Sequence, residues 1–77
     1  MTAGVVAGVL RKEDWTRLTV EAGGRERAVR CHEVASGGAD VLIRLGDHVR
    51  WKGRLLFWTP NDGFGVPVAL PLIGVES

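Results

Sequence analysis

Glycines divide this chain into short apolar segments, and their spacing restricts the fold more than any other feature. Eleven glycines stand mostly between runs rich in valine, leucine and tryptophan, and no window keeps apolar residues at helical spacing. The run 15–21 alternates, with Leu18 and Val20 on one face and Arg17 on the other. Because successive side chains of a strand point to opposite faces, this pattern predicts an all-β fold.

The chain is long enough for one hydrophobic core and no more. With 77 residues, 45% of them apolar and 25% charged, it has the composition of a soluble globular protein, and we expect a single domain over residues 1–77. Cys31 is the only cysteine, so an intrachain disulfide is excluded and a small secreted scaffold is not expected. The apolar run 3–10 is too short to span a bilayer, and we expect a cytoplasmic protein without a membrane segment.

Turn-forming residues separate six predicted strands. Gly23-Gly24 supplies the two flexible residues that a tight hairpin requires, and Pro-Asn-Asp-Gly at 60–63 is a loop signal. Gly46 is expected to bend the chain before the longest strand. Within that strand Gly53 indicates a β-bulge, which we favour over a tight turn at the same place. The predicted strands are 4–10, 15–21, 25–34, 40–45, 48–59 and 65–72.

Two of these strands are expected at sheet edges. The strand 25–34 carries charges on both faces, which is typical of an edge. In the strand 65–72, Pro67 and Pro71 face the same side, so two N–H groups are missing from any ladder there. Three apolar residues of the strand 40–45 are expected to face the core: Val41, Ile43 and Leu45.

Six short strands in so few residues favour a strongly bent sheet that closes into a small barrel. Two barrel types compete for this chain. The oligonucleotide-binding (OB) barrel usually has a helix between its third and fourth strands, and the corresponding stretch 33–39 is too short and too rich in glycine to form a stable one. We therefore favour a five- or six-stranded SH3-like barrel, with an OB-like barrel as the alternative.

Four segments follow one another in an order found in a family of small barrels. They are Gly4-Val5-Val6, Leu18-Thr19-Val20, Arg27-Ala28-Val29-Arg30-Cys31 and Leu45-Gly46-Asp47-His48-Val49. In this order the first two thirds of the chain resemble the RNA-binding barrels of the S1 and bacterial initiation-factor-1 type, and residues 46–49 are the most specific element. The stretch 51–60 departs from that family's pattern. The resemblance implies a barrel that binds RNA.

A basic and aromatic segment is the main candidate for a binding site. Alternation places Arg50, Lys52 and Arg54 on one face. Residues 25–54 hold seven basic and four acidic side chains, a local charge of +3 in a chain whose net charge is +1. Single-stranded nucleic acid requires cations for its phosphates and rings for its bases. The predicted nucleic-acid-binding residues are Arg44, Arg50, Trp51, Lys52, Arg54 and Trp58.

Other interpretations of the segment 48–59 stay open. In one, the cations form an ordinary solvated face, while Trp51, Phe57 and Trp58 fill the core. In another, apolar residues on both faces bury the second face against another copy or a protein partner, so that the barrel serves assembly. Trp15 also has two interpretations: it folds over a barrel end from the turn before the strand, or it is exposed at a partner surface.

Adjacent pairs of reactive side chains do not indicate catalysis. Cys31 and His32 are neighbours in a predicted strand, so they project to opposite faces and do not readily bind one metal ion. Cys31 shares its face with Val29 and is interpreted as a small core residue. The pair Asp47-His48 is interpreted as accidental as well. We therefore expect a non-enzymatic binding module with no metal and no cofactor.

Overall fold

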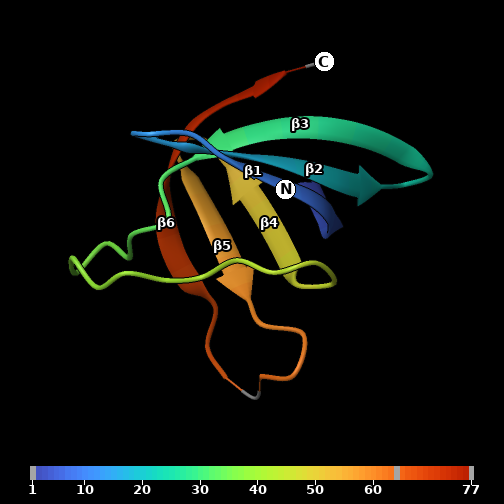
Figure 1. The fold of residues 1–77 in the computed structure, drawn as a ribbon. Coiled ribbons are helices and arrows are strands. Elements are labelled where there is room, and N and C mark those ends of the chain that lie inside the picture. The colour runs from blue at the N-terminus through green and yellow to red at the C-terminus, as the bar shows by residue number, and fades with distance from the viewer. Residues whose placement is uncertain (1, 64, 77) are drawn as a thin grey trace.

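The computed structural model describes residues 2–63 and 65–76 and contains six antiparallel strands. They are β1 (Thr2–Arg11), β2 (Thr16–Ala22), β3 (Arg25–Cys31), β4 (His48–Lys52), β5 (Leu55–Thr59) and β6 (Val68–Glu76). The strands close into a barrel in the order β1-β2-β3-β6-β5-β4 (Figure 1). The predicted all-β fold is confirmed, and this small closed barrel is compatible with both barrel types that the sequence favours.

Residues 2–63 and 65–76 contain no helix, and this includes the stretch 33–39 where an OB barrel usually has one. Within this part of the protein, accordingly, no helix is long and apolar enough to cross a membrane.

Inward-facing residues of all six strands form one core. Leu18 and Val20 are completely buried, as their alternation predicts, and Leu56 and Leu70 reach them from the other side of the barrel. Burial of such side chains contributes about 1.5–3 kcal/mol each, which makes this cluster the main source of stability. The buried apolar residues are Val6, Leu18, Val20, Val29, Cys31, Ile43, Val49, Trp51, Leu56, Trp58 and Leu70.

The hairpin between β2 and β3 is the one that the sequence predicts. Gly23 and Gly24 form a two-residue loop, with φ of 60° and 78°, between the paired residues Ala22 and Arg25. Positive φ at both central positions defines the turn whose twist matches that of the flanking strands, and glycine adopts it without steric cost. Figure 1 shows β2 and β3 running out together to one side of the barrel.

The predicted bulge at Gly53 is wrong. The segment 48–59 forms two strands, β4 and β5, in which Lys52 pairs with Leu55. Gly53, with φ of 62°, is the first residue of a two-residue turn, the position that glycine prefers in one hairpin class. A two-residue turn preserves the inward and outward alternation on both sides, so the hydrophobic pattern does not distinguish it from a continuous strand.

The predicted strand 40–45 is also wrong, because this segment is a loop with a single bridge between Val34 and Asp40. Ile43 does face the core and is 1% exposed, whereas Leu45 is 65% exposed. Side chains replace the expected ladder here. The Glu33 carboxylate accepts a hydrogen bond from the Ile43 N–H, and a terminal nitrogen of Arg11 donates one to the Ile43 carbonyl.

Both predicted edge strands lie inside the barrel. β3 ends at Cys31, earlier than expected, and pairs with β2 and β6. β6 starts later than predicted, at Val68, and pairs with β5 and β3. Closure of the barrel gives every strand two neighbours, although only residues 28–31 of β3 pair on both sides, and its first three residues, which are exposed, pair with β2 alone.

The prolines of the last strand remain compatible with this pairing because proline lacks only the donor. The carbonyl of Pro71 accepts a hydrogen bond from the His32 N–H at 3.0 Å, and the Ala69 carbonyl accepts one from the Ser36 N–H at 3.0 Å. On the opposite side of β6, the same stretch pairs regularly with β5. A register shift near Ile73 then brings the end of the strand onto β3.

Candidate functional site

The two tryptophans that were predicted to stack on bases lie in the core. Trp51 is 6% exposed and Trp58 is 9% exposed, because both occupy inward positions of β4 and β5. The indole Nε1 of Trp58 donates a hydrogen bond of 2.8 Å to the Asp47 carboxylate. Burial removes both rings as stacking surfaces, so their predicted contact with bases is wrong and their interpretation as core residues is the correct one.

The predicted cations stay exposed, but they do not all lie together. Arg50 and Lys52 point outward from β4, and Arg54 follows in the turn to β5. Arg44 precedes β4 and so lies at the opposite end of that strand from Arg54. It lines a hollow with the carboxylates of Asp40, Asp47 and Asp62. The acidic surroundings of Arg44 separate it from the other three cations.

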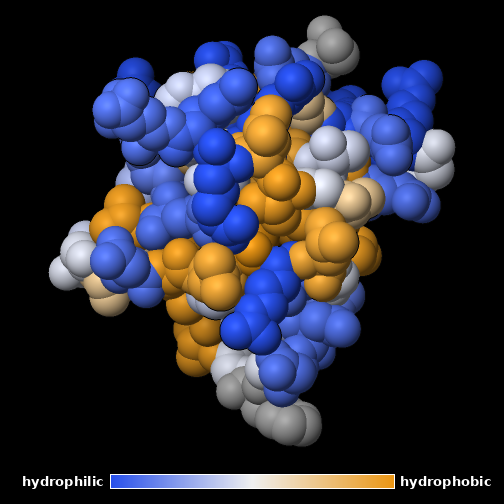
Figure 2. Space-filling view, in the orientation of Figure 1, coloured by the Kyte–Doolittle hydropathy of each residue, from blue (hydrophilic) through white to orange (hydrophobic). Residues whose placement is uncertain are grey.

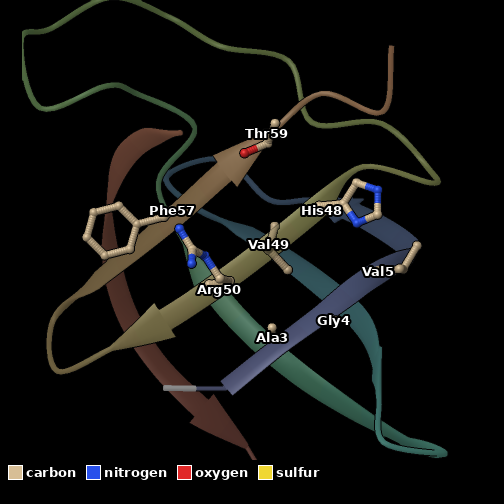
Figure 3. A pocket seen from close by; sticks show the side chains of 8 residues that line it. All are labelled: Ala3, Gly4, Val5, His48, Val49, Arg50, Phe57 and Thr59. Carbon is tan, nitrogen blue, oxygen red and sulfur yellow. The ribbon is translucent and has the colours of Figure 1, made fainter. Parts of the chain in front are cut away.

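Arg50 stands in an outward row that crosses four strands. In this row Ala3 of β1, Arg50 of β4, Phe57 of β5 and Ala69 of β6 are direct cross-strand partners. Because alanine is small, the row leaves Arg50 and the half-buried ring of Phe57 standing above their neighbours. Figure 3 shows the Arg50 side chain turned toward Phe57.

A shallow groove of about 320 Å³ follows this row on the outer face of β1, β4 and β5 (Figure 3). Sequence reasoning missed the contribution of β1, because only the tertiary pairing brings β1 beside β4. We call the outer face of β4, β5 and residues 2–5 of β1, which pair with β4, the basic wall. Its outward residues are Ala3, Val5, His48, Arg50, Lys52, Leu55, Phe57 and Thr59.

The basic wall carries no acidic side chain, because β1, β4 and β5 contain no Asp or Glu. Its two exposed cations, Arg50 and Lys52, therefore have no carboxylate on their own or the adjacent strands to neutralise them. Glu21, which pairs with Val5 from the neighbouring strand β2, marks the border of this area. The result is a locally positive surface on a protein whose net charge is only +1.

Asp47 fixes the entry into β4 and thereby the orientation of the basic wall. Its carboxylate accepts hydrogen bonds from the N–H groups of Arg44 and Asn61 at 2.8 and 2.9 Å, besides that from Trp58. Burial raises the pKa of Asp47, but these hydrogen bonds lower it by more, so its pKa lies below the usual value. The side chain of Asp47 is thus occupied by structural contacts.

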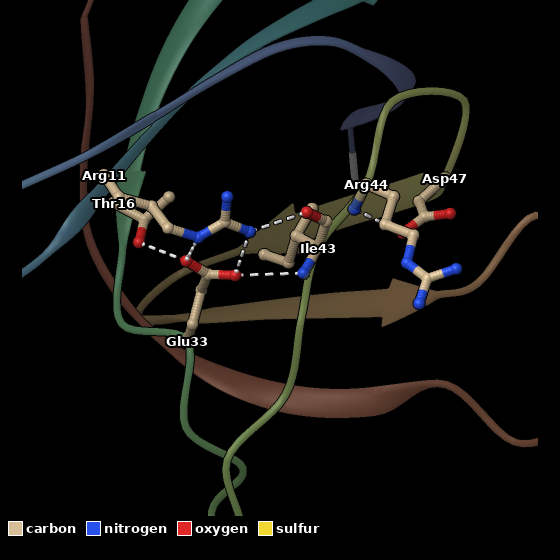
Figure 4. Close-up of polar contacts among 6 residues, drawn as sticks. All are labelled: Arg11, Thr16, Glu33, Ile43, Arg44 and Asp47. Atoms are coloured by element: carbon tan, nitrogen blue, oxygen red, sulfur yellow. Dashed lines mark hydrogen bonds and ion pairs between the residues drawn. The ribbon is translucent and has the colours of Figure 1, made fainter.

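Glu33 has a corresponding role at the other end of the same loop. Its carboxylate binds Arg11 Nε at 2.7 Å, Thr16 Oγ1 at 2.6 Å and the Ile43 N–H at 2.9 Å (Figure 4). Burial raises the pKa of Glu33, and the hydrogen bonds from Arg11, Thr16 and Ile43 lower it below its usual range. Glu33 therefore joins β1, β2 and the loop that leads to β4, and it holds Ile43 in the core.

Cys31 is a core residue, as predicted. It is completely buried, and burial together with the nearby charge of Glu33 raises the pKa of its thiol to about 12. A thiol with so high a pKa stays protonated at neutral pH and is a poor nucleophile and metal ligand. Among the residues that the structure describes, no three His, Cys, Asp or Glu side chains gather as metal ligands.

Trp15 lies just before β2 and is half-buried, which places it in the turn that the first interpretation assigned to it. The guanidinium carbon of Arg30 lies 6.0 Å from the centre of its ring. A cation at this distance from an indole ring is attracted by the electron density of the ring face.

No family model, curated protein or solved structure matches this chain. The interpretation of the basic wall consequently depends on its own geometry.

Proposed function

We propose that this barrel is a non-enzymatic binding module that takes single-stranded nucleic acid along the basic wall. The observation that carries the proposal is the combination of exposed cations, a half-buried ring and a groove on three strands without any acidic residue. The resemblance of residues 4–49 to S1-type and initiation-factor-1-type barrels supports the same class of ligand.

Phosphate contacts would come from Arg50 and Lys52. The two residues are next-but-one neighbours on β4, so their Cα atoms are about 7 Å apart along the strand. Arg54 continues the positive charge into the turn. Cations at this spacing can meet separate phosphates of one strand, and each contact releases bound counterions, which makes the affinity dependent on salt.

Base contact would come from Phe57, which takes the role that the sequence assigned to Trp51 and Trp58. The ring stands between Arg50 and Ala69 in the outward row, with the groove beside it. Stacking of one base on an aromatic side chain contributes about 1–3 kcal/mol and tolerates any sequence. We therefore expect binding with little sequence preference.

The test is the binding of a labelled mixed-sequence single strand of about 12 nucleotides, followed by fluorescence anisotropy. We expect binding at about 50 mM salt that weakens steeply toward 200 mM. The variant Arg50→Gln should lower the affinity and reduce the slope of log K against log salt by about 0.7, while the control Arg25→Gln, at the distant hairpin, should change neither by as much.

A second variant isolates the ring. Phe57→Leu keeps an apolar side chain of similar size and should weaken binding about 5-fold or more, because stacking is lost while the cations remain. Absence of any binding at low salt by the wild-type protein would contradict the proposal.

Assembly is a second candidate function, favoured by exposed apolar side chains. Val5, Leu55 and Ile73 are 39%, 40% and 43% exposed on the barrel exterior. Figure 2 shows apolar side chains gathering across the middle of one face between polar ones on either side. Such a surface suits contact with another copy or a protein partner. Light scattering over a range of concentrations tests it: a growing mass that Leu55→Lys abolishes supports self-assembly, and a constant monomer mass contradicts it.

A further inference from the structure

A second row of residues, on the outer face of β2, β3 and β6, brings two arginines together. Arg17 of β2, Arg30 of β3 and Gly74 of β6 are direct cross-strand partners. Like charges in directly opposite positions destabilise a sheet. Arg17 is balanced by Glu76, with 3.2 Å between Arg17 Nε and a carboxylate oxygen. Within residues 2–63 and 65–76, Arg30 has no corresponding ion pair.

The guanidinium of Arg30 is held in a defined place although it lacks a partner. On one side lies Gly74, where an added Cβ would come 3.0 Å from a terminal nitrogen of Arg30. On another side lies the ring of Trp15, 6.0 Å from the guanidinium carbon. The absent side chain of Gly74 thus leaves the space that the guanidinium occupies.

One donor of this guanidinium is buried and unused. The Nε of Arg30 is inaccessible to solvent and has no hydrogen-bond partner among the described residues. A buried donor without an acceptor is unfavourable, and most such groups in folded proteins are paired. The buried Nε is closed to a ligand, so an acceptor that reaches the half-buried Arg30 from outside would pair with the terminal nitrogens of the guanidinium.

We propose that Arg30 and Trp15 form a second contact point for single-stranded nucleic acid, in which Arg30 takes a phosphate and Trp15 stacks on the adjoining base. The proposal rests on the class of ligand proposed above, single-stranded nucleic acid, and not on the basic wall as the place where it binds. Arginine binds planar and tetrahedral oxyanions through two parallel hydrogen bonds, and a ring beside it adds a surface that bases use. A carboxylate of an acidic peptide would use the arginine alone.

The surroundings of Trp15 set the direction of the bound strand. A hollow next to the ring is lined by four acidic residues, Glu13, Asp14, Glu33 and Asp40, against two basic ones, Arg11 and Lys12, so that its negative balance disfavours phosphate. Arg17 and Arg30 lie outside this hollow, on the outer face of the sheet. The strand therefore runs from Trp15 over Arg30 toward Arg17.

Trp15 provides a specific readout, because the other two tryptophans are buried. We expect the single strand of about 12 nucleotides to quench the fluorescence of the wild-type protein at low salt. Trp15→Phe should remove most of this response. Arg30→Gln should lower the affinity measured by anisotropy about 5-fold or more, and reduce its salt slope by about 0.7. Gly74→Ala keeps the charge but fills the space under the guanidinium, and should weaken binding in the same direction.

Circular dichroism and thermal unfolding of each variant establish that the barrel is retained, and a result counts only for a folded variant. If Arg30→Gln and Gly74→Ala weaken binding while Arg50→Gln does not, the further site stands and the basic wall fails. If only Arg50→Gln weakens binding, the basic wall stands and the further site is overturned. Binding of an oligoglutamate peptide through Arg30, without a response to the oligonucleotide, overturns the further site in favour of a protein partner. A protein that binds neither probe overturns both proposals.

Discussion

The two sides of the barrel organise charge in different ways. The basic wall has Arg50 and Lys52 exposed among apolar and neutral side chains and no acid on its three strands. The outer face of β2 and β3 has equal numbers of cations and acids, with Arg17 opposite Arg30 at one end of the ladder and Glu21 opposite Glu26 at the other. A net charge of +1 therefore hides two surfaces of unlike character, and net charge alone is a poor guide to what such a protein binds.

The two sides also differ in how their aromatic residues are placed. Phe57 belongs to a row with small neighbours and a groove beside it, whereas Trp15 lies in a turn against the guanidinium of Arg30. The first arrangement leaves cations with no carboxylate partner on the surface. The second places one cation beside a ring, 6.0 Å from its centre, and against a glycine. Binding experiments on separate variants of Phe57 and Trp15 therefore test the two sides one at a time.

The largest effect on stability is expected from a change in the hydrophobic core, against which both sides pack. Leu56 is completely buried on β5, opposite Trp51. Leu56→Ala should lower the free energy of unfolding by about 2–5 kcal/mol, because it removes buried methyl groups and leaves a cavity. Urea unfolding followed by circular dichroism measures this loss. An unchanged urea midpoint would mean that the core does not hold the two sides together.

Acid should lower the stability of both sides together, because Glu33 and Asp47 hold the loop that joins β3 to β4. The pKa of each carboxyl is lower in the folded protein than its usual value. Such a group contributes stability that is complete above its unfolded-state pKa, about 4.3 for Glu and 3.9 for Asp, and that is lost as the pH falls toward the folded-state pKa. We therefore expect a urea midpoint that is steady near neutral pH and decreases below about pH 4.5.

The variant Glu33→Gln is the control for this effect. It should have a lower urea midpoint than the wild-type protein at neutral pH, since an amide replaces the carboxylate that binds Arg11, Thr16 and Ile43. Its midpoint should also depend less on acid, because one titrating group is gone. A wild-type midpoint that is the same at about pH 6 and pH 3 would contradict this account of the two carboxylates.

The smallest effect on stability is expected from the exposed ion pair between Arg17 and Glu76. Glu76 neutralises Arg17, and both side chains are nearly half exposed, at 45% and 46%. Glu76→Gln should change the free energy of unfolding by less than about 1 kcal/mol, since exposed ion pairs contribute little. It should nevertheless strengthen oligonucleotide binding and raise the salt slope by up to about 0.7, because it frees a cation beside Arg30. Weaker binding by this variant would show that the strand does not pass over Arg17.

Local patterns were sufficient for part of the fold. The alternation around Leu18 and Val20 predicts β2 and its buried face, and two consecutive glycines predict the hairpin that follows. The same alternation failed at Gly53, because a bulge and a two-residue turn are both compatible with it. It failed again at 40–45, where the expected strand pairing is replaced by contacts from Glu33 and Arg11, which are distant in sequence.

For the candidate site, the sequence identified the outward cations Arg50 and Lys52 but misplaced the rings. Trp51 and Trp58 occupy inward positions of β4 and β5. Which residues of β5 point inward depends on the turn that joins it to β4. The contributions of Ala3 and Val5 have no local signal, because β1 and β4 are far apart in the chain. Trp15 and Arg30, by contrast, are brought close by the two-residue turn at Gly23-Gly24, because its register pairs Arg17 with Arg30.

The sequence by itself determined that the chain is built of strands, since the period of two and the glycine turns are properties of neighbouring residues. Tertiary structure decided which strands became neighbours, which rings were buried and which cations were left without an acid beside them. The physical reason is that barrel closure pairs residues dozens of positions apart, and both burial and electrostatic potential are sums over those distant neighbours.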